Sequence, residues 1–289
     1  MDSDARIGVV GATGAVGTVT LGLLRERGYA NVRAYASARS AGKQLGDVTV
    51  EEATPEALTR GDLDLCLFSV GTSASRELVP LVVPEVNGAR ALEHEGIVAN
   101  PNCCAIPLTV ALKPIHDAAG LARVRVSTYQ SVSGAGAQRM EDLRATPSGE
   151  ADLAMDWDFD GVEFDEEAKL RDETRKILEL PELPISATTV RVPVLVGHAE
   201  AVWIETERKL SPDDARALLA KAPAVRLEEF PTPRVAAGGD DVLVGRIRRD
   251  PTAPNGLAFL VVCDNLRKGA ALNAIQIAEL VLERRAVPA

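Results

Sequence analysis

A glycine-rich turn near the N-terminus limits the folds open to this chain more than any other feature. Residues 6–10 form an apolar run of strand length, and glycines follow at positions 11, 14 and 17. An apolar pattern with helical spacing then continues through Leu24. Strand, glycine turn and helix form a variant of the dinucleotide-binding fingerprint, in which backbone approaches a pyrophosphate at the helix N-terminus. The turn therefore predicts a Rossmann-type α/β domain, and a purely structural turn is the weaker explanation.

The composition is that of an ordinary globular chain. Hydrophobic residues make up 46% and charged residues 26% of the 289 positions, which suits one large domain or two interleaved domains. No apolar run is long enough to span a membrane, and the acidic start at 1–4 lacks the pattern of a signal peptide, so we expect a soluble cytoplasmic protein. A net charge of −10 argues against a nucleic-acid surface, although an acidic protein can hold a local basic pocket for phosphates.

The cysteines and histidines do not form a recognisable disulfide or metal pattern. Cysteines stand at 66, 103, 104 and 263, and two of them, Cys66 and Cys263, lie in apolar runs where we expect inert burial. Histidines stand at 94, 116 and 198, without metal-ligand spacing to those thiols. We predict no metal site.

The segment Asn-Pro-Asn-Cys-Cys at 100–104 has the features of a nucleophile site. It lies between a short apolar run at 96–99, of strand length, and a helical pattern at 105–115. Unpaired N–H groups at a helix start favour negative charge, which lowers the pKa of a thiol. Asn102 offers an amide for an anionic substrate oxygen. The alternative is a buried cysteine pair in a small-residue packing site.

The loop after the second predicted strand selects between the two nicotinamide dinucleotides. The strand covers 32–36, and the loop at 37–43 reads Ser-Ala-Arg-Ser-Ala-Gly-Lys. An NAD site places Asp or Glu here for the ribose 2′-hydroxyl, whereas Ser37, Arg39, Ser40 and Lys43 suit a 2′-phosphate. We predict NADP; the alternative is a solvated basic loop.

The connection after the next strand is unusually short. Residues 64–70 are typical of a buried parallel strand, and Gly71 and Thr72 open a further candidate cofactor loop. Only residues 71–80 separate this run from the apolar run at 81–86, although a parallel crossover needs about a dozen residues or more. Either the second run is not a parallel neighbour, or an element is missing here.

The middle of the chain predicts a second, mixed α+β layer. Strand patterns at 123–132 and 188–196 alternate with acidic helical stretches. The first strand ends in a small-residue loop where backbone can approach a flat ring, and the segment 191–200 places Arg191 and His198 seven residues apart. The helix at 166–178 alternates Glu with Lys and Arg, which on spacing alone indicates a solvated face.

Seven segments in this order resemble the aspartate-semialdehyde dehydrogenase family and together cover nearly the whole chain. They are Gly-Ala-Thr-Gly-Ala-Val-Gly at 11–17, Ser-Ala-Arg-Ser-Ala-Gly-Lys at 37–43, Asn-Pro-Asn-Cys at 100–103, Tyr-Gln-Ser-Val-Ser-Gly-Ala-Gly at 129–136, Glu-Thr-Arg-Lys-Ile at 173–177, Arg-Val-Pro-Val at 191–194 with Gly-His-Ala-Glu at 197–200, and Asp-Asn-Leu-Arg-Lys-Gly-Ala-Ala at 264–271. Seven motifs in register are highly specific.

The resemblance implies roles that spacing alone does not give. Cys103 is the nucleophile, because it directly follows Asn-Pro-Asn. Cys104 stands where the family usually has a small residue, which implies that it is a bystander. Gln130 orients the substrate, His198 is the acid/base, and Arg191 clamps the substrate α-carboxylate. The other implied substrate contacts are Asn102, Lys169 and Glu166. The expected cofactor positions are Gly11, Thr13, Gly14, Ala15, Val16, Gly17, Ser37, Arg39, Ser40, Gly71, Thr72, Ser133, Gly134 and Asn265.

The reaction that the resemblance implies starts from β-aspartyl phosphate. The Cys103 thiolate attacks the acyl phosphate, phosphate leaves, and NADPH reduces the resulting thioester to aspartate β-semialdehyde, with His198 shuttling a proton. We expect a dinucleotide-binding domain at 1–103 with 268–289, a substrate and dimerisation domain at 104–267, and a homodimer formed through the latter. The C-terminal helix at 270–285 carries Leu272, Ile275, Ala278 and Leu282 on one apolar stripe, which predicts packing under the Rossmann sheet.

One departure from the family keeps other functions open. Between Glu77 and Leu81 the family carries the rest of a helix, a sheet strand and a Ser-Ser-x-x-Arg loop whose arginine binds phosphate, and this chain lacks that segment. The alternatives are a related acyl-phosphate reductase such as N-acetyl-γ-glutamyl-phosphate reductase, a reductase of another acyl donor such as a CoA thioester, or a catalytically impaired NADP-binding paralogue. The loss of one phosphate-binding charge predicts weakened turnover of the acyl phosphate.

Overall fold

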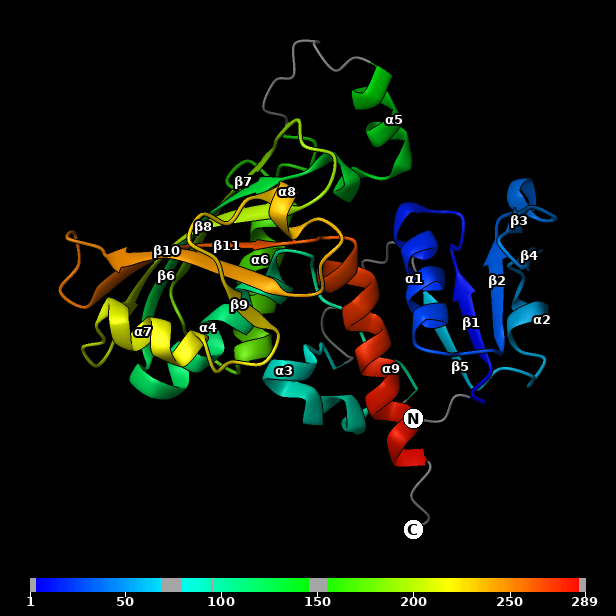
Figure 1. Ribbon diagram of the computed structural model, residues 1–289, viewed down its shortest axis with the longest axis horizontal. Coiled ribbons are helices and arrows are strands. Elements are labelled where there is room, and N and C mark those ends of the chain that lie inside the picture. Colours follow the sequence, from blue (N-terminus) through cyan, green and yellow to red (C-terminus); the bar gives the residue numbers. More distant parts are fainter. Residues whose placement is uncertain (1–3, 69–79, 95, 146–154, 286–289) are drawn as a thin grey trace.

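Two sheets organise the chain in the computed structural model, which describes residues 4–68, 80–94, 96–145 and 155–285 (Figure 1). The first sheet has the order β3-β4-β2-β1-β5, and all of its strands except β3 run parallel. Its strands are β1 (Ile7–Val10), β2 (Val32–Ala36), β3 (Gln44–Leu45), β4 (Val48–Glu52) and β5 (Leu65–Phe68). The helices along this part are α1 (Ala15–Glu26), η1 (Ala38–Ser40), α2 (Pro55–Leu58), α3 (Pro84–Asn87) and η2 (Gly88–Glu93).

The second sheet is mixed and has the order β7-β6-β8-β11-β10-β9. Its strands are β6 (Leu121–Gln130), β7 (Ile185–Arg191), β8 (His198–Thr206), β9 (Val225–Leu227), β10 (Val242–Arg249) and β11 (Gly256–Cys263). The remaining helices are α4 (Ala105–Ala119), η3 (Val132–Ala135), α5 (Ala137–Ala145), α6 (Asp165–Leu178), α7 (Pro212–Leu219), α8 (Pro233–Ala236), the π-helical turn η4 (Arg267–Ala271) and α9 (Leu272–Arg285). The predicted α/β class, a Rossmann-type domain with a second mixed layer, is confirmed.

The glycine turn between β1 and α1 has the geometry that the fingerprint requires. Gly11 has φ of 85°, a left-handed conformation that favours glycine. A Cβ on Gly17 would lie 2.2 Å from the carbonyl oxygen of Gly11, so only glycine allows the helix to start this close to the strand. The α1 helix begins after Gly14 without a side-chain cap, which leaves its first N–H groups available to an anion.

Helix α9 lies between the two parts of the molecule (Figure 1). Its residues Leu272, Ile275 and Leu282 pack into the core of the first sheet together with Ile7 and Val9. This confirms the apolar stripe predicted for this helix. On another face, α9 packs against the segment 80–99.

That segment does not extend the first sheet. Leu81 forms an isolated parallel bridge with Ala99 and does not pair with β5, so the run at 81–86 is not a parallel neighbour of β5. The predicted strand at 96–99 is therefore only a bridge. The prediction that the strand at 64–70 is buried is wrong. Cys66 is half-buried and Phe68 is 61% exposed. The reason is that, among the described residues, no strand lies beside β5 on its outer side.

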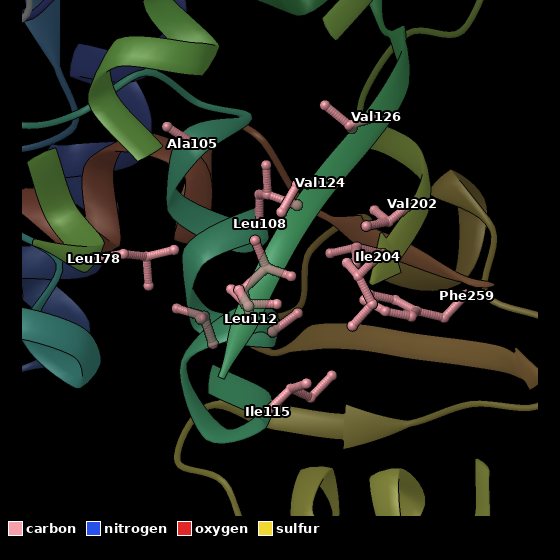
Figure 2. Close-up of a cluster of buried hydrophobic side chains, with 14 of the residues drawn as sticks. Ala105, Leu108, Leu112, Ile115, Val124, Val126, Leu178, Val202, Ile204 and Phe259 are labelled. Atoms are coloured by element: carbon pink, nitrogen blue, oxygen red, sulfur yellow. The ribbon is translucent and has the colours of Figure 1, made fainter. Parts of the chain in front are cut away.

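The core of the second sheet supports the helix that begins next to the cysteines. Helix α4 is buried along most of its length, and Leu108, Leu112 and Ile115 pack against strands β6, β8 and β11 (Figure 2). This packing fixes the position of the α4 N-terminus relative to the sheet. Across the described residues, every helix is too short or too polar to cross a membrane.

Candidate active site

Cys103 lies at the turn that leads into α4, where the side chain of Asn102 organises the chain. The Asn102 Oδ1 atom accepts hydrogen bonds from the N–H groups of Cys104 at 2.8 Å and Ala105 at 3.3 Å. These bonds fix the turn that precedes α4 and hold the Cys103 thiol at the N-terminal end of the helix. A Cβ on Gly269, in η4, would lie 3.2 Å from the Cys103 carbonyl oxygen, so the π-helical turn packs closely behind the thiol.

The surroundings of Cys103 stabilise a thiolate. Its pKa is well below that of an ordinary thiol, first because of the neighbouring Cys104 thiol and then because of His198 and Arg191, although burial acts in the opposite direction. Burial raises the pKa of Cys104 well above its usual value, so Cys104 keeps its proton. The lowered pKa of Cys103 agrees with the sequence prediction. The residues that lower it, however, are brought together only by the fold.

His198 stands at the start of β8 with its ring fixed by Ser131. The Nδ1 atom accepts a hydrogen bond from the Ser131 N–H at 3.0 Å and lies 3.1 Å from the Ser131 hydroxyl. The Ser131 N–H therefore makes Nδ1 an acceptor, which places the ring hydrogen of a neutral imidazole on Nε2. Nε2 is buried and has no hydrogen-bond partner among the described residues, so it remains available to a reacting group.

Glu166 connects the two amide side chains of the site. Its Oε1 atom accepts from Asn102 Nδ2 at 2.9 Å and from Gln130 Nε2 at 3.0 Å. Burial and the nearby Cys103 raise its pKa, while these two hydrogen bonds act in the opposite direction. The Gln130 Oε1 atom in turn accepts from Arg191 Nη1 at 3.4 Å. The structure thus joins the predicted residues of α6, β6 and β7 in one network beside Cys103.

Arg191 is buried, and its guanidinium also meets two residues that sequence reasoning missed. Its Nε and Nη2 atoms donate to Asp156 Oδ1 at 3.3 and 3.1 Å, and its Cζ lies 4.5 Å from the ring centre of Trp157. Asp156 lies in an acidic stretch, so the sequence does not indicate that this residue contacts Arg191.

Lys169 does not join this network. Its Nζ atom donates to Asp165 Oδ2 at 2.6 Å, one turn earlier on α6, and its side chain is 28% exposed. The i,i+4 pair is the one that the helical spacing predicts. Within the described residues, Lys169 contacts a carboxylate rather than Asn102, with which it was expected to share a phosphate.

Glu200 is a further buried group that the sequence analysis did not single out. It follows His198 by two residues on β8 and is only 1% exposed, and both carboxyl oxygens are without a hydrogen-bond partner among the described residues. Burial and the negative charge of Cys103 raise its pKa well above that of an ordinary carboxyl group. Strand alternation was the available signal, because residues two apart on a strand share a face.

The raised pKa of Glu200 predicts a pH-dependent effect of Glu200→Gln. As pH rises above the carboxyl's unfolded pKa, the unfolded chain releases this proton while the folded chain keeps it, so wild-type stability falls until the folded pKa is passed. Glutamine has no proton to release. Between pH 5 and pH 8 the variant is therefore expected to gain stability relative to the wild type by about 1–3 kcal/mol, since each unit of pKa shift corresponds to about 1.4 kcal/mol. Urea unfolding at both pH values measures this, and an equal difference at both would contradict it.

The expected cofactor residues gather at the carboxyl ends of the parallel strands. The turn carrying Gly11, Thr13, Gly14, Ala15, Val16 and Gly17 follows β1, and the loop carrying Ser37, Arg39 and Ser40 follows the adjacent β2. Ligands of open α/β sheets bind at this edge. Arg39 is exposed and forms no ion pair with any described residue. Gly71 and Thr72 lie outside the described residues.

The other expected cofactor residues lie near His198 and Arg191. A Cβ on Gly134 would lie 2.9 Å from Arg191 Nη1 and 3.2 Å from His198 Nε2, so glycine keeps this approach open. Asn265 is buried, and its Oδ1 accepts from the Gly197 N–H at 2.9 Å and from the Ser133 hydroxyl at 3.0 Å. Asn265 thus ties together the loops that carry the site.

Cys103, Cys104 and His198 also come close enough to share a metal ion. One ligand atom from each lies within 4.8 Å of the other two, although their sequence spacing gave no such indication. Thiolates and imidazole are zinc ligands. The absence of a metal site stays a prediction.

A Rossmann sheet beside a buried thiol, an imidazole and a guanidinium defines the class of NAD(P)-dependent dehydrogenases. Two family models match the chain: "Semialdehyde dehydrogenase, NAD binding domain" over 6–86, and "Semialdehyde dehydrogenase, dimerisation domain" over 112–156 and 157–268. The chain belongs to the aspartate-semialdehyde dehydrogenase family, as the following relatives show.

The aspartate-semialdehyde dehydrogenase of Streptomyces akiyoshiensis is 44% identical over 333 aligned residues, covering 96% of this chain and 98% of the relative. The crystal structure of aspartate semialdehyde dehydrogenase II from Vibrio cholerae, complexed with ASA, superimposes with a TM-score of 0.91 at 36% identity and covers 97% and 98% of the two chains. The crystal structure of the Candida albicans aspartate semialdehyde dehydrogenase with NADP superimposes with a TM-score of 0.76 at 25% identity. The match covers 98% of this chain and 100% of that one. An alignment of 333 residues exceeds the 289 of this chain, so the relative has residues without a counterpart here.

Proposed function

We propose that the chain catalyses the NADPH-dependent conversion of β-aspartyl phosphate to aspartate β-semialdehyde and phosphate. The observation that carries this proposal is the convergence of Cys103, His198, Gln130 and Arg191 from four separate elements on one buried site. Family membership favours this function over the related acyl-phosphate reductases, an acyl-CoA reductase and an impaired paralogue.

The chain's residues fit NADP. The uncapped start of α1 suits the pyrophosphate, and the free side chain of Arg39 suits a 2′-phosphate. The open approach above Gly134 suits the nicotinamide ring, which would then face Cys103 and His198. When bound, the reduced nicotinamide supplies the hydride.

In the first step, the Cys103 thiolate attacks the acyl carbon, and the bond from that carbon to the phosphate oxygen breaks. Phosphate leaves with the electron pair, and a thioester remains on Cys103. Arg191 holds the α-carboxylate of the substrate, and Gln130, fixed between Glu166 and Arg191, orients the acyl group.

After hydride transfer, a thiohemiacetal stands on Cys103. His198 gives a proton from Nε2 to the new oxygen and takes it back when the carbon–sulfur bond breaks. The Ser131 N–H, which donates to Nδ1 at 3.0 Å, holds the imidazole ring in place. The Cys103 thiolate is released for the next cycle.

Phosphate binding is the step in which this chain departs most from its family. Asn102 and Lys169 are the expected contacts, and in the structure both have internal partners, Glu166 and Asp165. With no counterpart of the family's Ser-Ser-x-x-Arg loop, we expect a high KM for phosphate rather than a loss of cofactor binding.

We further propose that the protein is cytoplasmic and forms a homodimer. Its domain boundaries would lie at 103/104 and 267/268. The match to a dimerisation-domain model supports the dimer, as does the face of the second sheet opposite α4, where Arg125 and Tyr129 are exposed. Sedimentation analysis would test it.

The reaction is tested in reverse, as phosphate-dependent reduction of NADP⁺ with aspartate semialdehyde, beside a thermal-shift titration with NADP⁺. Turnover at an ordinary enzymatic rate supports the proposal. A clear NADP⁺ shift without turnover would instead identify an impaired paralogue.

Arg39→Ala tests the choice of cofactor. Loss of the one guanidinium in the 37–43 loop should raise KM for NADPH about tenfold or more, since hydrogen bonds to a charged phosphate are lost, and should leave KM for NADH within about twofold. Steady-state kinetics with both cofactors measure this. Equal changes for the two would contradict a 2′-phosphate contact.

A further inference from the structure

The two adjacent thiols of the site differ in accessibility and in charge. Cys103 is half-buried, whereas Cys104 is fully buried. Cys104, His198 and Arg191 lower the pKa of Cys103, while burial raises the pKa of Cys104, which keeps its proton. Because the thiolate is the form of cysteine that an oxidant attacks, a small hydroperoxide that enters the site reacts first at Cys103.

The Cys104 sulfur is close enough to take part in a second step. The Sγ atoms of Cys103 and Cys104 lie within 4.8 Å of one another. A disulfide has a sulfur–sulfur distance of about 2.05 Å, so rotation of the two side chains has to bring the sulfurs at most roughly 3 Å closer. A low-pKa, accessible cysteine beside a second thiol is the arrangement in which oxidation is resolved by a disulfide.

The backbone between the two cysteines can accommodate this bond. Adjacent Cα atoms lie about 3.8 Å apart, less than the roughly 4.4–6.8 Å that a disulfide usually spans, so the 103–104 peptide has to twist. That peptide lies outside the hydrogen-bond ladder of α4. Pro107 has no N–H to donate to the Cys103 carbonyl oxygen, and the Cys104 N–H donates to the Asn102 side chain, which can follow it. The strain of a bond between neighbours also makes it easy to reduce.

We propose that Cys103 and Cys104 form a reversible disulfide when the protein meets a hydroperoxide, with Cys103 as the site of oxidation and Cys104 as the resolving thiol. The Cys103 thiolate attacks one oxygen of hydrogen peroxide, the O–O bond breaks, and a sulfenic acid forms as hydroxide leaves. The Cys104 sulfur then attacks the Cys103 sulfur, the S–O bond breaks, and the hydroxyl group leaves with the Cys104 proton as water. A dithiol reductant, itself oxidised to a disulfide, restores both thiols.

This disulfide protects the nucleophile from permanent damage. A sulfenic acid that meets more peroxide goes on to sulfinic and sulfonic acids, which a thiol does not reduce. Attack by the neighbouring Cys104 competes with that loss, and Cys103 cannot accept an acyl group until the disulfide is reduced. Burial raises the pKa of Cys66 and of Cys263, which keeps these two thiols out of the reaction.

Mass spectrometry of the tryptic peptide 91–123 tests this, because the peptide contains Cys103 and Cys104 and no other cysteine. After treatment of the folded protein with hydrogen peroxide, the wild-type peptide should lose two hydrogen atoms, and dithiothreitol should restore its mass. In Cys104→Ser, and equally in Cys104→Ala, the peptide should instead gain two or three oxygen atoms that dithiothreitol does not remove. The fraction of Cys103 that iodoacetamide labels after reduction should be about tenfold or more higher in the wild type.

Cys66→Ser is the matched control, because it removes another half-buried thiol, on β5, and leaves the pair intact. It should form the disulfide as the wild type does. A wild-type peptide 91–123 that stays unchanged, or that gains oxygen as readily as in Cys104→Ser, would overturn the proposal. A disulfide from Cys103 to Cys263 or to a second chain would do the same. The modification is distinct from the proposed reaction, and its detection by mass needs no turnover, so either can fail without the other.

Discussion

Replacement of Cys103 by alanine is expected to lower kcat by at least about 10⁴-fold and to leave the NADP⁺ thermal shift unchanged. The acyl group has no other acceptor: without the thiolate, neither the thioester nor the thiohemiacetal can form. The structure gives this thiol a much lowered pKa beside Cys104, His198 and Arg191. Phosphate-dependent reduction of NADP⁺ with aspartate semialdehyde is the assay.

Cys104→Ala is the control for this prediction, and it also tests a revised role for Cys104. The sequence suggested a bystander, yet the Cys104 thiol is the largest single reason for the low pKa of Cys103. The variant should keep activity within about tenfold while the pH profile of Cys103 alkylation by iodoacetamide moves upward. Full activity in Cys103→Ala together with a loss in Cys104→Ala would show that the nucleophile was assigned to the wrong residue.

The local elements of the fold could be predicted because each depends on a few neighbouring residues. The glycines at 11, 14 and 17 predicted the turn because the backbone leaves no space for a Cβ at Gly17. A single apolar stripe predicted helix α9. Burial was harder to predict: Leu65–Phe68 resembles a core strand in composition, and only the missing neighbour leaves it half-exposed. Such information lies in the sheet order and is absent from the strand itself.

The candidate site divides in the same way. Motif resemblance supplied Cys103, Gln130, Arg191 and His198, because the family's spacing stands in for contacts that span up to 95 positions of sequence. It could not supply Asp156, which belongs to this chain's own acidic segment and meets Arg191 only through the fold. A sequence motif also does not distinguish a residue that has an internal partner, such as Lys169, from one that is free to bind a ligand.

The short connection raises the question of what holds the segment 80–99 without a sheet strand on its flank. Polar contacts with η4 and α9, near the C-terminal end of the chain, hold this segment in place. The Lys268 Nζ atom in η4 donates to both oxygens of Glu85 in α3, at 2.8 and 2.7 Å, and to Gln276 Oε1 at 2.8 Å. Asn273 Nδ2 donates to the Val82 carbonyl oxygen at 3.0 Å. These bonds join the segment to α9, one turn from the residues that pack behind Cys103.

Glu85→Ala is therefore expected to lower the free energy of unfolding by about 3–5 kcal/mol, because it leaves the fully buried ammonium of Lys268 unpaired. For a domain of this size that corresponds to a fall in Tm of roughly 6–20 °C. Burial already lowers the pKa of Lys268, and Glu85 opposes this effect. Removing Glu85 lowers that pKa further, so the folded variant binds fewer protons than the unfolded chain, and its stability rises with pH.

The deficit of Glu85→Ala relative to the wild type should accordingly be largest in acid and shrink as pH rises toward the ordinary pKa of lysine, which urea unfolding at several pH values measures. Asp117→Ala breaks the exposed pair with Lys113 and should change stability by only about 0.5 kcal/mol or less. The double variant Glu85→Met with Lys268→Met should recover much of the loss, since apolar side chains can replace a buried ion pair. A deficit independent of pH and not recovered by the double variant would mean that Glu85 holds the segment by packing rather than by its charge.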